Sequence, residues 1–134
     1  MNQKVLQKQL ENRGFIVHVA NHGGEALALL RKSRLWKDIS TSGREANEPP
    51  LELDAILMDQ EMPVMGGLEA TQMIREWEKK DLLVAHVPII GVTANARKEQ
   101  IKALLSAGMD DVVSKPFRMP ELLPKVEVLI RGST

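Results

Sequence analysis

The chain has 134 residues, a length that fits one domain with a hydrophobic core of its own. Lysine plus arginine equals aspartate plus glutamate at 18 each, which excludes a global charge field that would attract nucleic acid or an anionic membrane. Cysteine is absent, which excludes disulfides and thiolate chemistry, and no apolar run approaches the ~20 residues that span a bilayer. We therefore expect a cytoplasmic protein that contacts neither nucleic acid nor membrane.

The first part of the chain predicts a helix, a strand, a second helix and a long loop. Leu6 and Leu10 lie one turn apart in the first helix, and the β-branched run 15–20 predicts a strand. Residues 23–33 predict a helix with one apolar face. Residues 34–50 lose all periodicity and gather Ser, Gly, Asn and Pro, so we expect a flexible loop that faces solvent.

The rest of the chain alternates strands with helices. Residues 53–59 are apolar on both faces, as in a central parallel strand, and residues 86–94 and 110–114 predict two more strands. Three helices complete the pattern, and the side chains that we expect to face inward are Ala70, Met73, Ile74 and Trp77 in the first, Ile101, Leu104 and Leu105 in the second, and Leu122, Leu123, Val126, Leu129 and Ile130 in the third.

This alternation predicts an α/β fold. Strands that alternate with helices pair in parallel through right-handed crossovers, which gives an open, doubly wound sheet with helices on both faces. In such sheets the functional sites form at the carboxyl ends of the strands. Polar side chains where the predicted strands end are therefore the candidate site residues.

Asp59, Thr93 and Lys115 each close or follow an apolar run at such an end. A carboxylate, a hydroxyl and an ammonium that converge suit phosphoryl transfer: the carboxylate attacks phosphorus, while the other two offset charge on the transferring oxygens. Taken singly, each has an ordinary explanation, namely a turn aspartate, a helix cap and a surface lysine. Their occurrence at three matched ends favours the chemical explanation.

Four motifs carry a resemblance to a known family: "NQKVL", "ILMDQEMPVMGG", "PIIGVTANAR" and "AGMDDVVSKPF". On these the chain resembles a response-regulator receiver domain, most closely that of a fungal-type hybrid histidine kinase. The resemblance covers nearly all of residues 1–134 as a single domain, apart from the 34–50 loop. It implies a flavodoxin-like sheet with strand order 2-1-3-4-5 and a role in phosphorelay signal transduction.

The resemblance also implies roles for individual residues. Asp59 would accept a phosphoryl group from phosphohistidine on a histidine kinase or phosphotransfer protein, and Thr93 and Lys115 would contact that group. Mg²⁺ would bind Asp59, the backbone carbonyl of Glu61 and acids of the family's first strand. Such a domain is not an independent enzyme. It would catalyse its own aspartyl phosphorylation once the metal site is complete, and the parent protein would be a histidine kinase.

Further residues are expected to shape the loops of this site. Pro63, Gly66 and Gly67 would turn the chain after Asp59, although a plain helix start explains the two glycines equally well. By the resemblance, the peptide bond before Pro116 would be cis, so that the preceding lysine points inward.

The chain also departs from the family pattern. It begins at Met1, where the family's first strand and its acidic pair would already have ended, so we expect an incomplete sheet and weak Mg²⁺ binding. Either another segment fills the place of that strand, or residues 15–20 pair directly with residues 53–59. The missing acids leave open an alternative function, a pseudo-receiver that binds proteins without phosphotransfer.

Two smaller departures concern other residue types. Val112 stands where the family commonly has an aromatic switch residue, so rotation of an aromatic ring cannot be carried over. His18, His22 and His86 lack the spacing of metal ligands, and we expect solvent-facing or hydrogen-bonded roles for them.

Overall fold

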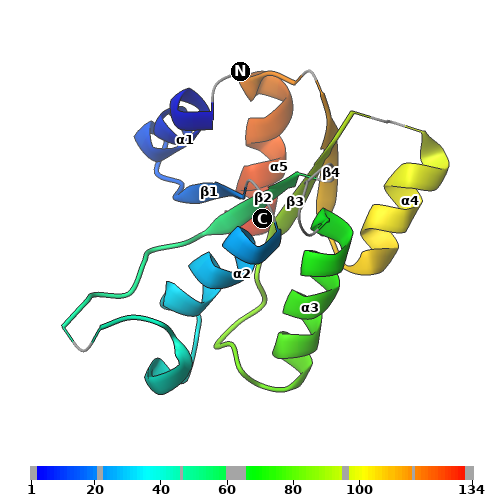
Figure 1. Cartoon of the computed structure of the whole chain (residues 1–134). Coiled ribbons are helices and arrows are strands. Elements are labelled where there is room, and N and C mark those ends of the chain that lie inside the picture. The colour runs from blue at the N-terminus through cyan, green and yellow to red at the C-terminus, as the bar shows by residue number, and fades with distance from the viewer. Residues whose placement is uncertain are drawn as a thin grey trace.

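The computed structural model describes residues 3–20, 23–45, 47–59, 66–94, 97–115 and 117–131, with the backbone alone for Gln3, Lys4 and Asp59. Helices and strands alternate as predicted, with one added 3-10 helix (Figure 1). In chain order they are α1 (Gln3–Asn12), β1 (Val17–Ala20), α2 (Gly23–Lys32), η1 (Ile39–Thr41), β2 (Ala55–Asp59), α3 (Gly67–Lys79), β3 (Ile89–Thr93), α4 (Lys98–Ala107), β4 (Asp111–Ser114) and α5 (Met119–Arg131). Among the helices described, none has the length and apolar character needed to cross a membrane.

The four described strands form one parallel sheet in the order β1-β2-β3-β4. β1 pairs directly with β2, from Val17 opposite Ala55 to Ala20 opposite Met58. This is the second of the two arrangements that the sequence allowed, in which residues 15–20 move over to residues 53–59. The fold class is confirmed as an α/β, flavodoxin-like parallel sheet with helices on both faces.

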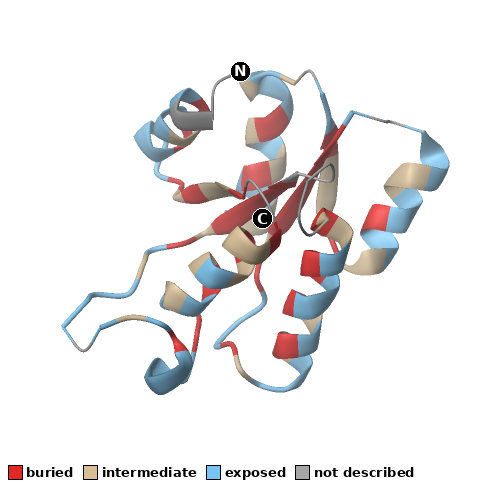
Figure 2. Cartoon of the chain, viewed as in Figure 1, coloured by how far each residue is buried: buried red, intermediate tan, exposed pale blue. Residues whose placement is uncertain are grey.

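Two hydrophobic cores lie on the two faces of this sheet. Along β2 the side chains alternate between them, because successive residues of a strand point to opposite faces. The α1/α5 core consists of Leu6, Leu10, Phe15, Val17, Ala55, Leu57, Ile90, Val92, Val113, Leu122 and Val126. The α2–α4 core consists of Ala20, Ala26, Leu30, Leu35, Trp36, Leu53, Ile56, Met58, Ala70, Ile74, Trp77, Leu83, Val87, Ile89, Leu104 and Met109. Figure 2 shows both as red stripes on the strands and on the inner helix faces.

Two predictions of inward-facing side chains were wrong. Met73 on α3 and Leu105 on α4 are 42% and 44% exposed. On α3 the buried stripe is shifted around the helix to include Thr71 in place of Met73. On α4 only Leu104 is buried, because this helix lies beside β4, the edge strand of the sheet, and meets less of the sheet surface (Figure 1).

The prediction that residues 34–50 face solvent was wrong for part of the segment. Leu35 and Trp36 are buried, at 5% and 7% exposure. The Trp36 ring meets Trp77 of α3 edge to face, with ring centroids 5.0 Å apart, and its Nε1 donates a hydrogen bond to Thr41 Oγ1 at 3.0 Å. Burying two such large rings together stabilises the segment against α3. The flexibility of the remainder stays a prediction.

Candidate functional site

The candidate site lies at the carboxyl edge of the sheet, where β2, β3 and β4 end side by side. The Cα of Asp59 is in register with Val92, and that of Thr93 with Ser114. Neighbouring strands lie ~4.8 Å apart, so the last residues of three strands are adjacent here. The Lys115 N–H donates to the Thr93 carbonyl at 2.8 Å, which keeps the ladder intact to its end. The structure thus brings together the backbones of the three residues that the sequence singled out.

The side chains at this edge differ in their exposure. Thr93 is fully buried, whereas Lys115 is exposed. The Asp59 side chain is outside the described part of the chain. The roles of all three residues in phosphoryl transfer stay predictions.

The loop residues of the predicted site are described only in part. Gly66 is the N-cap of α3, with φ −67° and ψ 155°, and a Cβ there would meet no atom within 4 Å. Gly67 is the first residue of α3 and is buried. The pair therefore fits a plain helix start, one of the two interpretations left open. Glu61, Pro63 and Pro116 lie outside the described residues, and with Pro116 the predicted cis peptide bond.

Metal binding is not resolved by the described residues. Among them, no group of three or more His, Cys, Asp or Glu side chains could hold a metal ion. The two predicted ligands, the Asp59 side chain and Glu61, lie outside the described residues. Magnesium binding therefore stays a prediction for this chain.

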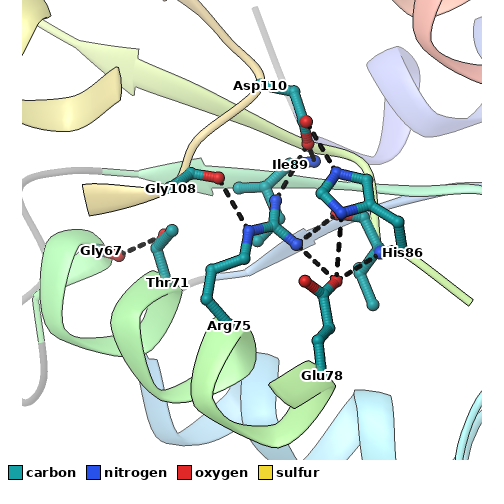
Figure 3. Close-up of polar contacts among 9 residues, drawn as sticks. Gly67, Thr71, Arg75, Glu78, His86, Ile89, Gly108 and Asp110 are labelled. Atoms are coloured by element: carbon teal, nitrogen blue, oxygen red, sulfur yellow. Dashed lines mark hydrogen bonds and ion pairs between the residues drawn. The ribbon is translucent and has the colours of Figure 1, made fainter. Parts of the chain in front are cut away.

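A polar cluster that was not predicted from the sequence lies at the opposite, amino edge of the sheet (Figure 3). We call it the amino-edge cluster and define it as Arg75, Glu78, His86 and Asp110. The Arg75 guanidinium donates to four partners: the Gly108 carbonyl (2.8 Å), the Val87 carbonyl (2.9 Å), Glu78 Oε2 (2.6 Å) and Asp110 Oδ2 (3.0 Å). It therefore ties α3 to the segments that enter β3 and β4.

The acids of the amino-edge cluster also accept bonds from the backbone and from His86. Glu78 Oε2 accepts the Val87 N–H and Asp110 Oδ2 accepts the Ile89 N–H, both at 2.8 Å. His86 Nε2 lies 2.7 Å from Asp110 Oδ1. This confirms a hydrogen-bonded, partly exposed role for His86. The i, i+3 spacing of Arg75 and Glu78 was the only local signal of the cluster in the sequence.

The chain matches the family model of the response regulator receiver domain over residues 1–127. It is 39% identical, over 126 residues, to Hybrid signal transduction histidine kinase I of Dictyostelium discoideum, covering 94% of this chain and 6% of that protein. It is 34% identical, over 124 residues, to Two-component system protein A of Emericella nidulans, covering 92% of this chain and 15% of that protein. The chain thus spans a small fraction of these relatives.

Solved structures give the same result. The receiver domain of a sensor histidine kinase from Pseudomonas aeruginosa, with a magnesium ion in its active site cleft, is 33% identical with a TM-score of 0.65, and the match covers 98% of this chain and 89% of that one. The receiver domain of a Francisella response regulator is 25% identical with a TM-score of 0.68, at the same coverage of 98% and 89%.

Proposed function

We propose that this chain, which belongs to the response regulator receiver domain family, accepts a phosphoryl group on Asp59. Receiver domains of this kind act in two-component phosphorelay systems, and the relatives reported above include hybrid histidine kinases. One observation carries the proposal: Asp59, Thr93 and Lys115 end or follow three consecutive strands at one edge of the sheet. The donor would be a phosphohistidine on a histidine kinase or phosphotransfer protein.

The chemistry follows from the three residue types. A carboxylate oxygen of Asp59 attacks the phosphorus atom, a new P–O bond forms, and the P–N bond to the donor imidazole breaks. Negative charge on the phosphoryl oxygens is offset by the Lys115 ammonium. The Thr93 hydroxyl donates a hydrogen bond to one of these oxygens. Since strand ends hold these groups, little rearrangement is needed when the donor arrives.

The predicted ligands at this site are oxygen atoms, which is the kind of ligand that Mg²⁺ binds. Mg²⁺ prefers oxygen donors in octahedral geometry and is usually held by one or two carboxylates together with phosphate and water. Asp59 and the Glu61 carbonyl would supply two such oxygens. The bound ion would neutralise charge between the attacking carboxylate and the phosphoryl oxygens. Because Asp59 is the one carboxylate ligand predicted beside Lys115, we propose that the affinity for Mg²⁺ is low.

The second candidate function is a pseudo-receiver that binds a partner without accepting phosphate. The observation in its favour is the direct pairing of β1 with β2 over four residues of each strand. This pairing makes the described sheet continuous without a further strand between them. A chain folded in this way presents the same helices and loops to a partner whether or not a metal site is complete.

Transfer from a phosphorylated donor distinguishes the two candidates. The donor would be a histidine kinase or phosphotransfer domain, labelled on its histidine and incubated with the chain, and the product measured by intact mass. We expect a labelled chain, and no labelling of the Asp59→Asn variant. The matched control is Asp81→Asn, because Asp81 is exposed, lies at the amino edge and has a positive φ that asparagine tolerates. An unlabelled wild type would favour the pseudo-receiver.

A further inference from the structure

The imidazole ring of His86 lies between the two carboxylates of the amino-edge cluster (Figure 3). Its Nε2 is 2.7 Å from Asp110 Oδ1, and its Nδ1 is 3.4 Å from Glu78 Oε2. A neutral imidazole carries a proton on one of these nitrogens only, so the lone pair of the other nitrogen then faces a carboxylate oxygen. The imidazolium has an N–H at both positions and therefore suits both neighbours at once.

We propose that the amino-edge cluster is a pH-sensitive switch, in which protonated His86 holds residues 84–88 against α3 and the turn before β4. The charges of the cluster support this role. The Arg75 guanidinium contacts Glu78 and Asp110, so one positive charge faces two negative ones while His86 is neutral. Protonation of His86 balances these charges. Loss of that proton leaves the cluster with an excess negative charge and with a lone pair that faces a carboxylate.

The remaining charged groups near His86 do not oppose its protonation. Among the described residues, His86 lines a small cavity together with Arg34 and Asp54, and α5 contributes leucine and isoleucine side chains to the same cavity. Arg34 Nε lies 3.1 Å from Glu52 Oε2, and its guanidinium lies 3.8 Å from Asp54 Oδ1. The positive charge of Arg34 is therefore already matched by acids of its own.

The two carboxylates that face His86 also hold the backbone that enters β3. Glu78 Oε2 accepts the Val87 N–H and Asp110 Oδ2 accepts the Ile89 N–H, both at 2.8 Å. Repulsion between a neutral ring and a carboxylate loosens these bonds. The stabilisation is thus present at low pH and is lost as the pH rises. Because the His86 side chain is 56% exposed, solvent reduces the effect to about that of one hydrogen bond.

Amide hydrogen exchange measures the switch directly, as protection factors that correct for the intrinsic pH dependence of exchange. We expect the protection factors of the Val87 and Ile89 amides to fall about three- to tenfold from about pH 5.5 to about pH 8, the range in which histidines titrate. In His86→Gln, which keeps a hydrogen-bond donor but does not titrate there, they should not change with pH. His18→Gln is the matched control and should behave as the wild type.

Each other outcome would overturn the switch. Wild-type protection factors that stay constant or rise with pH would show that protonated His86 does not hold the segment. A fall that persists in His86→Gln would assign the effect to another group. The Phe15 amide, which donates to the Leu10 carbonyl at 2.9 Å, tests for a global change, because a parallel fall there would mean that the whole chain loses stability. No phosphoryl donor is present, so the result does not depend on the function proposed above.

Discussion

The two edges of the sheet are built in different ways. At the amino edge, one guanidinium from α3 bonds to two carboxylates and two carbonyls, and those carboxylates accept further bonds from the backbone. At the carboxyl edge, the three predicted site residues come one each from the ends of β2, β3 and β4. The first arrangement satisfies its own members and holds loops in place. The second places the backbones of three polar residues side by side, and we propose that their side chains form a site for a transferred group.

Trp36→Ala should have the largest effect of the changes at the amino edge. Trp36 is buried against Trp77, so truncation leaves a cavity and should cost about 3–5 kcal/mol of unfolding free energy. Urea unfolding followed by circular dichroism measures the loss. Ile39→Ala is the control from the same segment, since Ile39 is 55% exposed and should change stability by at most about 0.5 kcal/mol. Equal losses for the two variants would show that the segment does not pack as described.

Removal of the charge at the centre of the amino-edge cluster should have the next largest effect. Arg75→Met leaves Glu78 and Asp110, whose side chains are only 18% and 20% exposed, without their cation. We expect a loss of about 2–4 kcal/mol, below the full value for a buried pair because some solvent reaches the carboxylates. Lys80→Met is the matched control: its partner Glu76 is 55% exposed, so the loss should stay below about 1 kcal/mol.

We expect the amino edge to serve stability and the carboxyl edge to serve phosphoryl transfer. Loss of labelling in folded molecules of Arg75→Met would contradict this difference between the edges. The labelling rates of the wild type and of Arg75→Met are therefore compared without urea, at a temperature where both proteins remain folded. The prediction is that Arg75→Met changes stability and leaves the labelling rate per folded molecule unchanged.

A Mg²⁺ titration sharpens the description of the carboxyl edge. We predict that Lys115 pairs directly with Asp59, so a cation must displace an ammonium and shed tightly held water for a single carboxylate. A longer form that carries a first strand ending in two acids should bind Mg²⁺ at least about tenfold more tightly and be labelled faster. Equal affinity in the two forms would show that the added acids do not matter, and the case for the pseudo-receiver would then rest on the β1–β2 pairing alone.

The smallest effect concerns Asp38, which caps η1. Hydrogen bonds from the Ser40 hydroxyl and then from its N–H hold the pKa of Asp38 below its usual value of 3.8. Because the pKa is lowered, the cap contributes its full stabilisation at pH values above the ordinary pKa of an aspartate. This stabilisation is lost as the pH falls through the pKa of Asp38 in the folded chain. The Ser40 amide shift, followed by NMR, should titrate with a midpoint below 3.8. A midpoint at or above that value would contradict the cap.

The sequence was sufficient for the order of the elements and for the edge that holds the site. β-branched runs and i, i+3, i+4 spacing are local signals, and in a parallel sheet the end of each strand lies at one edge. What it missed depends on contacts between distant residues. Trp36 packs on Trp77 from a segment without periodicity, and Arg75 meets Asp110 across 35 positions. The prediction that Met73 faces inward was wrong, because an apolar residue at the margin of the buried face of a helix can lie on the exposed side of that margin.

The most direct test of the account is to locate the phosphoryl group on the chain. The wild type is labelled from a phosphorylated donor, digested with protease, and its labelled carboxylate identified by peptide mass spectrometry. The account predicts that the label is on Asp59, at the carboxyl end of β2, and on no other aspartate or glutamate. A label on any other side chain, or one that persists in Asp59→Asn, would contradict it.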